Sequence, residues 1–144
     1  MEWKDVRLQV DVPPGWVRLD DVEPLTFQTP TGLRLRLTPL DYPERLRHHG
    51  ISERPLLDWA LEVAEQGRFN GDTTTHVKPC RFGLCASVVY ADRVLGQRLQ
   101  LWFLASDAHV LLVSLHGQPD GEELTGAVDC VESMHLVPAT LYPN

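Results

Sequence analysis

The sequence predicts an α+β fold in which an antiparallel β-sheet of about six or seven strands is flanked by two main helices. Three features predict this fold. Segments of alternating apolar residues follow one another through short turns, which favours antiparallel pairing. Two further segments carry apolar residues at helical spacing. The hairpin expected over residues 97–117 has apolar side chains on both faces, so we place it at the sheet centre with a helix on each side.

Length and charge limit the classes of protein that this chain can represent. Its 144 residues predict a single domain, with a core over residues 6–137 and a loose tail over 138–144. The 13 Lys and Arg against 20 Asp and Glu give a formal charge of -7. This charge disfavours binding to nucleic acid or to a membrane surface. The polar N-terminus and the 3 cysteines predict a cytoplasmic protein.

The first 50 residues predict a strand, a hairpin and a loop. Alternating apolar residues over 6–12 predict a half-exposed strand, which the sequence Pro-Pro-Gly-Trp at 13–16 ends. The segments 25–29 and 33–37 predict a hairpin with a Pro-Thr-Gly turn, and its wet arginine face places it toward a sheet edge. Residues 39–50, with two prolines and two adjacent histidines, predict a connecting loop.

Two helices and four consecutive strands follow. The first helix is expected to begin after Ser52 and to end near Gly67. Its predicted apolar stripe consists of Leu57, Ala60, Leu61 and Ala64. The predicted strands cover 73–79, 85–91, 98–104 and 109–115. Asp120 and Glu123 have the spacing of a capping box at the start of the second helix, and a short last strand is predicted over 134–137.

The order of elements and several local motifs resemble one known group of proteins. The motifs are Pro-Gly-Trp at 14–16, a Thr-Gly turn within the hairpin 27–37, Phe-Gly-Leu-Cys-Ala at 82–86, and Ser-Met-His-Leu at 133–136. Over residues 6–137 the chain resembles the superfamily of the photosystem extrinsic protein PsbP, its yeast Ran-binding relatives and the bacterial DcrB-like and Eag-type chaperone proteins. The resemblance implies an α/β/α sandwich that binds proteins rather than catalysing a reaction, and it carries over no site residue.

The leading functional hypothesis is therefore a non-enzymatic protein-binding or adaptor domain. Its narrower form is a chaperone for secretion effectors, because such chaperones are cytosolic and of similar size. The residues expected at a protein interface are Trp3, Arg34, Arg36, His48 and His49. The contact surface is expected on a concave sheet face or on the predicted loop 39–50. A second copy of the chain, paired through an edge strand or a tryptophan patch, is an alternative partner.

Cys80 and Cys85 suggest a redox protein as a chemical alternative. If Phe82 and Gly83 form a two-residue turn, the cysteines face each other across a hairpin, as a redox pair or, with His76, as zinc ligands. A longer loop is the alternative, because Phe is unfavourable in the left-handed conformation that such a turn often needs. The sequence favours two reduced, partly buried thiols instead, because zinc sites in proteins use four ligands at closer spacing.

A small hydrolase that uses rim histidines is the other enzymatic alternative. His109, His116 and His135 are predicted at strand ends, where Asp107 or Ser114 could meet them. Ser114 lacks the Gly-x-Ser-x-Gly sequence typical of an acyl-transfer serine, which favours a packing role.

No cofactor or metal is expected. The sequence contains no Walker loop and no Gly-x-Gly-x-x-Gly motif, so nucleotide binding has no support. The carboxylates of Asp20, Asp21 and Glu23 lack the regular alternation of a calcium loop and predict a solvated acidic turn.

Overall fold

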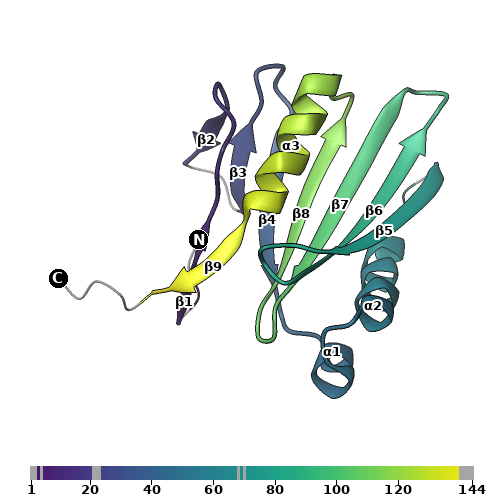
Figure 1. The fold of residues 1–144 in the computed structure, drawn as a ribbon. Helices are drawn as coiled ribbons and strands as arrows, with labels where there is room; N and C mark the ends of the chain where they lie inside the picture. Colours follow the sequence, from purple (N-terminus) through teal and green to yellow (C-terminus); the bar gives the residue numbers. More distant parts are fainter. Residues whose placement is uncertain (1–2, 4, 21–23, 68, 70, 140–144) are drawn as a thin grey trace.

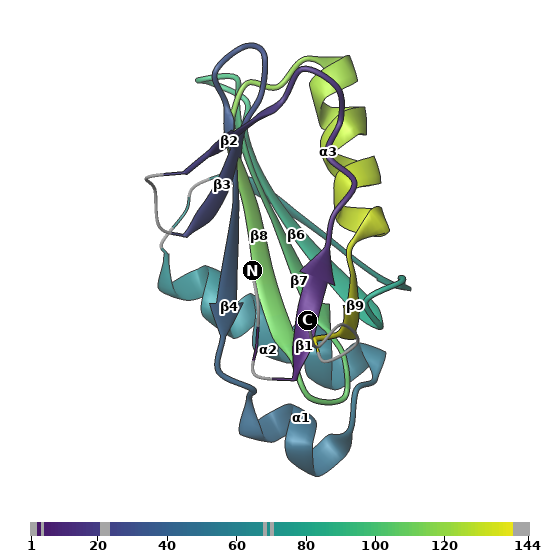
Figure 2. The same cartoon turned by 90° about the vertical axis from the view of Figure 1, so that its left-hand side faces the viewer.

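A seven-stranded antiparallel sheet organises the molecule, with strand order β2-β3-β4-β8-β7-β6-β5. The computed structural model describes residues 3, 5–20, 24–67, 69 and 71–139. The strands of this sheet are β2 (Val17–Leu19), β3 (Leu25–Gln28), β4 (Arg34–Leu40), β5 (Asp72–Pro79), β6 (Leu84–Asp92), β7 (Gln97–Ala105) and β8 (Val110–Gly117). Helices α2 (Glu53–Gln66) and α3 (Gly121–Ser133) lie on opposite sides of the sheet (Figure 1 and Figure 2), which confirms the predicted fold class.

The hairpin of β7 and β8 lies at the sheet centre, as predicted, because its side chains are apolar on both faces. Towards α3, Trp102 and Leu104 join a buried cluster with the inner face of that helix. Towards α2, Leu101 and Phe103 join a second buried cluster. Each of these strands buries apolar side chains on both of its faces. A central position in the sheet allows this, and the burial stabilises it.

The two main helices bury small and branched side chains on the sheet. α2 has Ser52 and Gly67 at its ends, as predicted, but its buried stripe is rotated by one residue from the predicted one. The fully buried positions are Leu56, Ala60 and Ala64, whereas Leu57 and Leu61 are partly exposed. Among the described residues, no helix is both long and apolar enough to cross a membrane.

The predicted loop over residues 39–50 is wrong. β4 continues to Leu40, and α1 (Glu44–His49) follows after a short connection. Pro43 precedes the first helical residue with a φ of -70°, a value that suits the start of a helix. Leu46, only 1 % exposed, joins α1 to the cluster beneath α2. A six-residue helix with one buried side chain gives no readable periodicity, and this is why the prediction failed.

The first and last strands leave the main sheet. β1 (Val6–Gln9) pairs with β9 (His135–Pro138) in a separate two-stranded sheet beside α3 (Figure 2). β2, which the sequence did not predict, takes the edge of the main sheet, so the hairpin of β3 and β4 lies one strand further in. Two residues of the predicted tail are tied to the fold, because Pro138 belongs to β9 and the Ala139 N–H donates to the Asp5 carbonyl at 3.1 Å. Residues 140–144 lie outside the described residues.

Candidate functional site

The sheet face that carries α2 is covered over only part of its width. α2 packs on β5, β6 and β7. On the same face of the neighbouring strands, Arg34 and Arg36 of β4 are exposed, and Arg36 is the register partner of Ser114. We call this surface the open sheet face. It consists of Val17, Gln28, Arg34, Arg36, Ser114 and His116.

Exposed apolar side chains lie on the open sheet face, at Val17, and beside its residue His116, at Phe69 and Leu95. The large apolar side chains with the highest exposure among the described residues are Val17 at 60 %, Phe69 at 44 %, Val94 at 93 % and Leu95 at 62 %. The ring of Phe69 lies 5.5 Å from that of Tyr90, and a pocket of about 250 Å³ lies between Phe69, Leu95 and His116. Apolar and aromatic residues next to arginines are a composition typical of protein interfaces.

The structure separates the five residues predicted at an interface. Arg34 and Arg36 lie together on the open sheet face. Trp3 lies on the opposite side of the sheet, where its ring is 5.2 Å from that of His109. His48 is exposed on α1, and His49 is the last residue of that helix. Arg34 and Arg36 therefore share one surface, and neither Trp3 nor His48 belongs to it.

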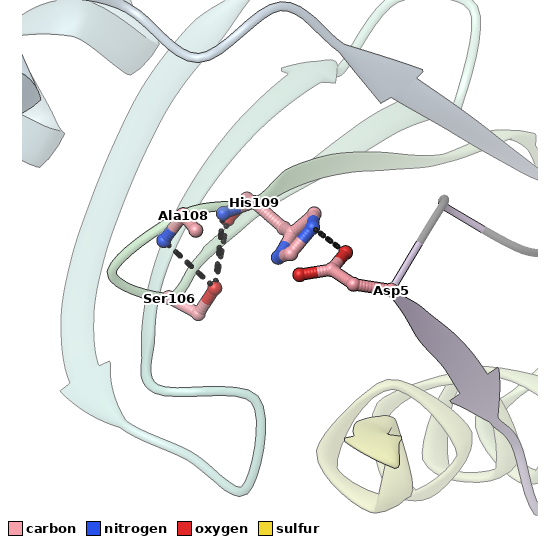
Figure 3. Close-up of polar contacts among 4 residues, drawn as sticks. All are labelled: Asp5, Ser106, Ala108 and His109. Carbon is pink, nitrogen blue, oxygen red and sulfur yellow. Dashed lines mark hydrogen bonds and ion pairs between the residues drawn. The ribbon is translucent and has the colours of Figure 1, made fainter. Parts of the chain in front are cut away.

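Asp5, Ser106 and His109 meet at the turn between β7 and β8 (Figure 3). The Asp5 carboxylate lies 3.3 Å from Nε2 of His109. Ser106 Oγ accepts the N–H groups of Ala108 and His109 at 3.4 and 3.1 Å and donates to the His109 carbonyl at 3.3 Å. The Ser106 hydroxyl thus forms hydrogen bonds with the main chain of the turn rather than with the imidazole of His109. The three residues therefore lack the nucleophile–base hydrogen bond of a hydrolase and instead stabilise the turn.

The two-residue turn at Phe82 and Gly83, which the sequence left open against a longer loop, is not formed. Cys80 and Gly83 exchange main-chain hydrogen bonds of 3.1 Å in both directions, so Arg81 and Phe82 are the central residues of the turn. The register partner of Cys85 is Lys78, which also forms an ion pair with a glutamate of α3. Cys80 and Cys85 consequently lie diagonally on one face, line a pocket of about 170 Å³, and are free thiols.

Burial makes the thiols poor nucleophiles. Burial, with a smaller contribution from the neighbouring Cys80, raises the pKa of Cys85 to about 12. Burial likewise raises the pKa of Cys80, although the main-chain N–H groups of the turn oppose the rise. The pKa of Cys130 in α3 is raised to about 12 by burial, with a smaller effect of Asp11. Because the thiolate is the reactive form, this geometry favours a packing role for the cysteines.

Thiol titration checks this assignment. In native, unreduced protein we expect Cys80 alone to react with a thiol reagent at pH 8, slowly, because Cys85 and Cys130 are 5 % and 1 % exposed. Unfolding should release all three thiols. The Cys80→Ser variant should lose the native reaction and keep two thiols after unfolding. Release of only one thiol from unreduced wild-type protein would show a disulfide and contradict the assignment.

No metal site is formed by the described residues, since no three of their His, Cys, Asp or Glu side chains are arranged to hold an ion. His76 lines the same pocket as Cys80 and Cys85 without completing a ligand set. Asp21 and Glu23 lie outside the described residues.

The structure contains a groove that the sequence did not predict. It has a volume of about 740 Å³ and lies between the turn after β1, the β3–β4 turn and the first half of α3. We call it the acidic groove. Its lining residues include Pro13, Trp16, Pro30, Thr31, Glu122 and Asp129. The capping box gave the only sequence signal at this place, and it marked a helix start rather than a groove.

The buried carboxylate of Glu123 fixes one wall of the acidic groove. It accepts the Thr31 hydroxyl at 2.7 Å, and the predicted capping box with Asp120 is confirmed by bonds of 2.7 and 3.3 Å. Burial on its own would raise the pKa of Glu123. The hydroxyl groups of Thr29 and Thr31 and the N–H groups of Asp120 and Thr31 outweigh burial, and the pKa lies below its ordinary value.

Comparison with solved structures identifies the fold. The cyanobacterial PsbP (CyanoP) of Synechocystis sp. PCC 6803 superimposes with a TM-score of 0.56 at 12 % identity, over 94 % of this chain and 95 % of that chain. LpqN of Mycobacterium tuberculosis, described as involved in cell envelope biogenesis, gives a TM-score of 0.54 at 14 % identity, over 92 % and 84 %.

A structure from Bacteroides thetaiotaomicron gives a TM-score of 0.52 at 13 % identity over 88 % of this chain. This chain spans only 44 % of the length of that protein. No family model matches the chain, and no curated protein matches its sequence. At these identities the likeness concerns the fold alone, and this chain has the PsbP-like α+β fold.

Proposed function

We propose that this chain is a non-enzymatic protein-binding domain and that its contact surface is the open sheet face. One observation carries the proposal: Val17, Phe69 and Leu95 expose apolar surface beside the half-face that presents Arg34 and Arg36. Exposed apolar surface next to arginine and aromatic residues supports a protein interface. A partner that binds there would cover β4 and β8 in the way that α2 covers β5, β6 and β7 on the same face.

The charges of this face indicate the chemistry of the partner. Arg34 and Arg36 are two residues apart on β4 and point to the same face of the sheet, in a chain whose formal charge is -7. They favour a partner segment with carboxylates, which form charge-assisted hydrogen bonds with guanidinium groups. The apolar border favours apolar side chains in the same segment.

The narrower proposal is a cytoplasmic chaperone for a secreted effector. It rests on the resemblance to DcrB-like and Eag-type proteins, and it requires the bound segment to belong to an exported protein. Affinity capture from the native cell, with cross-linking to identify the bound segment, distinguishes an exported protein from a resident cytoplasmic one.

Charge reversal on the open sheet face tests the proposed contact surface. The Arg34→Glu/Arg36→Glu variant should lower the affinity for the captured partner by about tenfold or more, because each new carboxylate repels those of the partner. The matched control Arg54→Glu/Arg81→Glu makes the same change of charge on exposed positions of α2 and the β5–β6 turn. This control should bind as the wild type does.

Two outcomes would contradict the proposal. One is a partner that binds both double variants equally well. The other is a concentration-dependent dimer in sedimentation that disappears in Arg34→Glu/Arg36→Glu, because a second copy of the chain would then occupy the open sheet face.

A further inference from the structure

We propose that the acidic groove is a second binding site, separate from the open sheet face, and that it takes an extended, arginine-bearing segment of a protein. The groove lies on the α3 side of the molecule, whereas Arg34 and Arg36 face the side of α2. The two sites therefore differ in position and in the charge they select.

The floor of the groove is apolar and partly aromatic. Pro13, Pro14 and Trp16 come from the turn after β1, and Pro30 comes from the β3–β4 turn. A Cβ on Gly126 of α3 would lie 3.4 Å from both Pro13 and Trp16, which is van der Waals contact distance, so the turn packs closely against the helix at this glycine. The half-buried indole of Trp16 supplies a flat surface for stacking.

The rim of the groove is acidic. Asp120, Glu122 and Asp129 are exposed along α3, and none of the described residues that line the groove is basic. Anions bind readily at free helix N-termini. Here the carboxylates of Asp120, Glu122 and Glu123 already occupy the first turn of α3, and they repel an incoming anion. The groove thus selects for a cation.

The walls of the groove are held in place before any ligand arrives. The Trp16 N–H donates to the Pro13 carbonyl at 3.3 Å and closes the first turn. The second turn is closed by the Gly32 N–H, which donates to the Thr29 carbonyl at 2.9 Å. The Thr31 hydroxyl then ties this turn to Glu123 of α3. Preformed walls lower the entropy cost of binding.

An arginine side chain can interact with the aromatic floor and the acidic rim of the groove at the same time. Its planar guanidinium group can stack on an indole and at the same time form paired hydrogen bonds with a carboxylate. Lysine offers a point charge without that planar geometry. The volume of about 740 Å³ lies in the range of small-ligand sites, and the open groove between two turns suits an extended segment such as a polyproline-type helix.

Synthetic peptides test the assignment. A short proline-rich peptide with two arginines should bind at least about tenfold more tightly than the same peptide with glutamines, and its affinity should fall as salt is added. The Glu122→Gln/Asp129→Asn variant should reduce this affinity about tenfold, and Trp16→Phe should reduce it several-fold because phenylalanine is a weaker cation–π partner. Calorimetry or NMR titration measures each value.

Controls separate this site from the open sheet face. Glu53→Gln/Asp107→Asn removes the same charge from exposed positions outside the groove and should leave peptide binding unchanged, as should Arg34→Glu/Arg36→Glu. Equal binding of the arginine and glutamine peptides, tighter binding of a glutamate peptide, or no binding of the arginine peptide at millimolar concentration would each overturn the proposal. So would an equal loss of affinity in the groove variant and the Glu53→Gln/Asp107→Asn control.

Discussion

Replacement of Phe103 by alanine should lower the free energy of unfolding by about 3–5 kcal/mol. Phe103 has no exposed surface and lies in the middle of β7, between Ala86 of β6 and Leu112 of β8. Its ring packs against the Trp59 ring of α2 in a T-shaped arrangement, with the ring centroids 5.3 Å apart. Alanine removes both the buried ring and this contact, and it leaves a cavity that the close-packed neighbours cannot fill.

The neighbouring residue provides the matched comparison, because Leu104 points to the other face of the same strand and is also fully buried. Leu104→Ala should cost about 2–5 kcal/mol. Val94→Ala, at a position 93 % exposed, should change the free energy of unfolding by no more than about 0.5 kcal/mol. Urea denaturation measures all three values, and Phe103→Leu replaces the alanine variant if that variant does not fold.

A cost below about 1 kcal/mol at either Phe103 or Leu104 would mean that one face of the central strand is open to water. That result would contradict the two-sided cover on which the fold depends. Comparable losses at adjacent residues of one strand are expected only in a sheet that is covered by elements on both sides.

The sequence predicts those parts of the fold that local patterns encode. The alternation of apolar residues in 97–117 is a property of neighbouring residues, and it placed β7 and β8 at the centre. The capping box at Asp120 and the tight connection between the predicted strands 98–104 and 109–115 are likewise short-range patterns, and both are present. Local chemistry is a reliable guide where the partner of a group lies within a few residues.

Contacts between segments that are distant in the sequence could not be predicted. β1 has the pattern of a strand, but nothing near it shows that it pairs with β9, more than a hundred residues away. β2 has three residues, too few to show alternation. The acidic groove combines two turns and a helix from different parts of the chain, so no single segment carries its signature.

The candidate interface shows the same division. The alternation of leucine and arginine over 33–37 predicts exposed arginines, and the structure exposes both Arg34 and Arg36. Whether a helix covers them depends on where α2 lies on the sheet. The segment of α2 does not itself encode that position, and α1, which connects β4 to α2, was not predicted as a helix. The open sheet face therefore became visible only in the assembled fold.

Replacement of Glu123 by alanine should cost about 2–3 kcal/mol of the free energy of unfolding. The side chain is buried, and it accepts bonds from the Thr31 hydroxyl and from the Asp120 N–H, which closes the capping box. Alanine would leave these donors without their acceptor and would release the β3–β4 turn from α3. The exposed neighbour Glu122 is the control, and Glu122→Ala should stay within about 0.5 kcal/mol of the wild type.

The same carboxylate makes part of the stability depend on pH. Its pKa in the folded state is below the ordinary value of 4.5, so the ionised form is the one that folding favours. The contribution is therefore complete above pH 4.5 and is lost as the pH falls through the folded-state pKa. The difference in stability between wild type and Glu123→Gln should be constant from pH 7 to about pH 5 and should shrink below that. A difference that grows on acidification would mean that folding favours the protonated carboxyl group, and it would contradict the lowered pKa of Glu123.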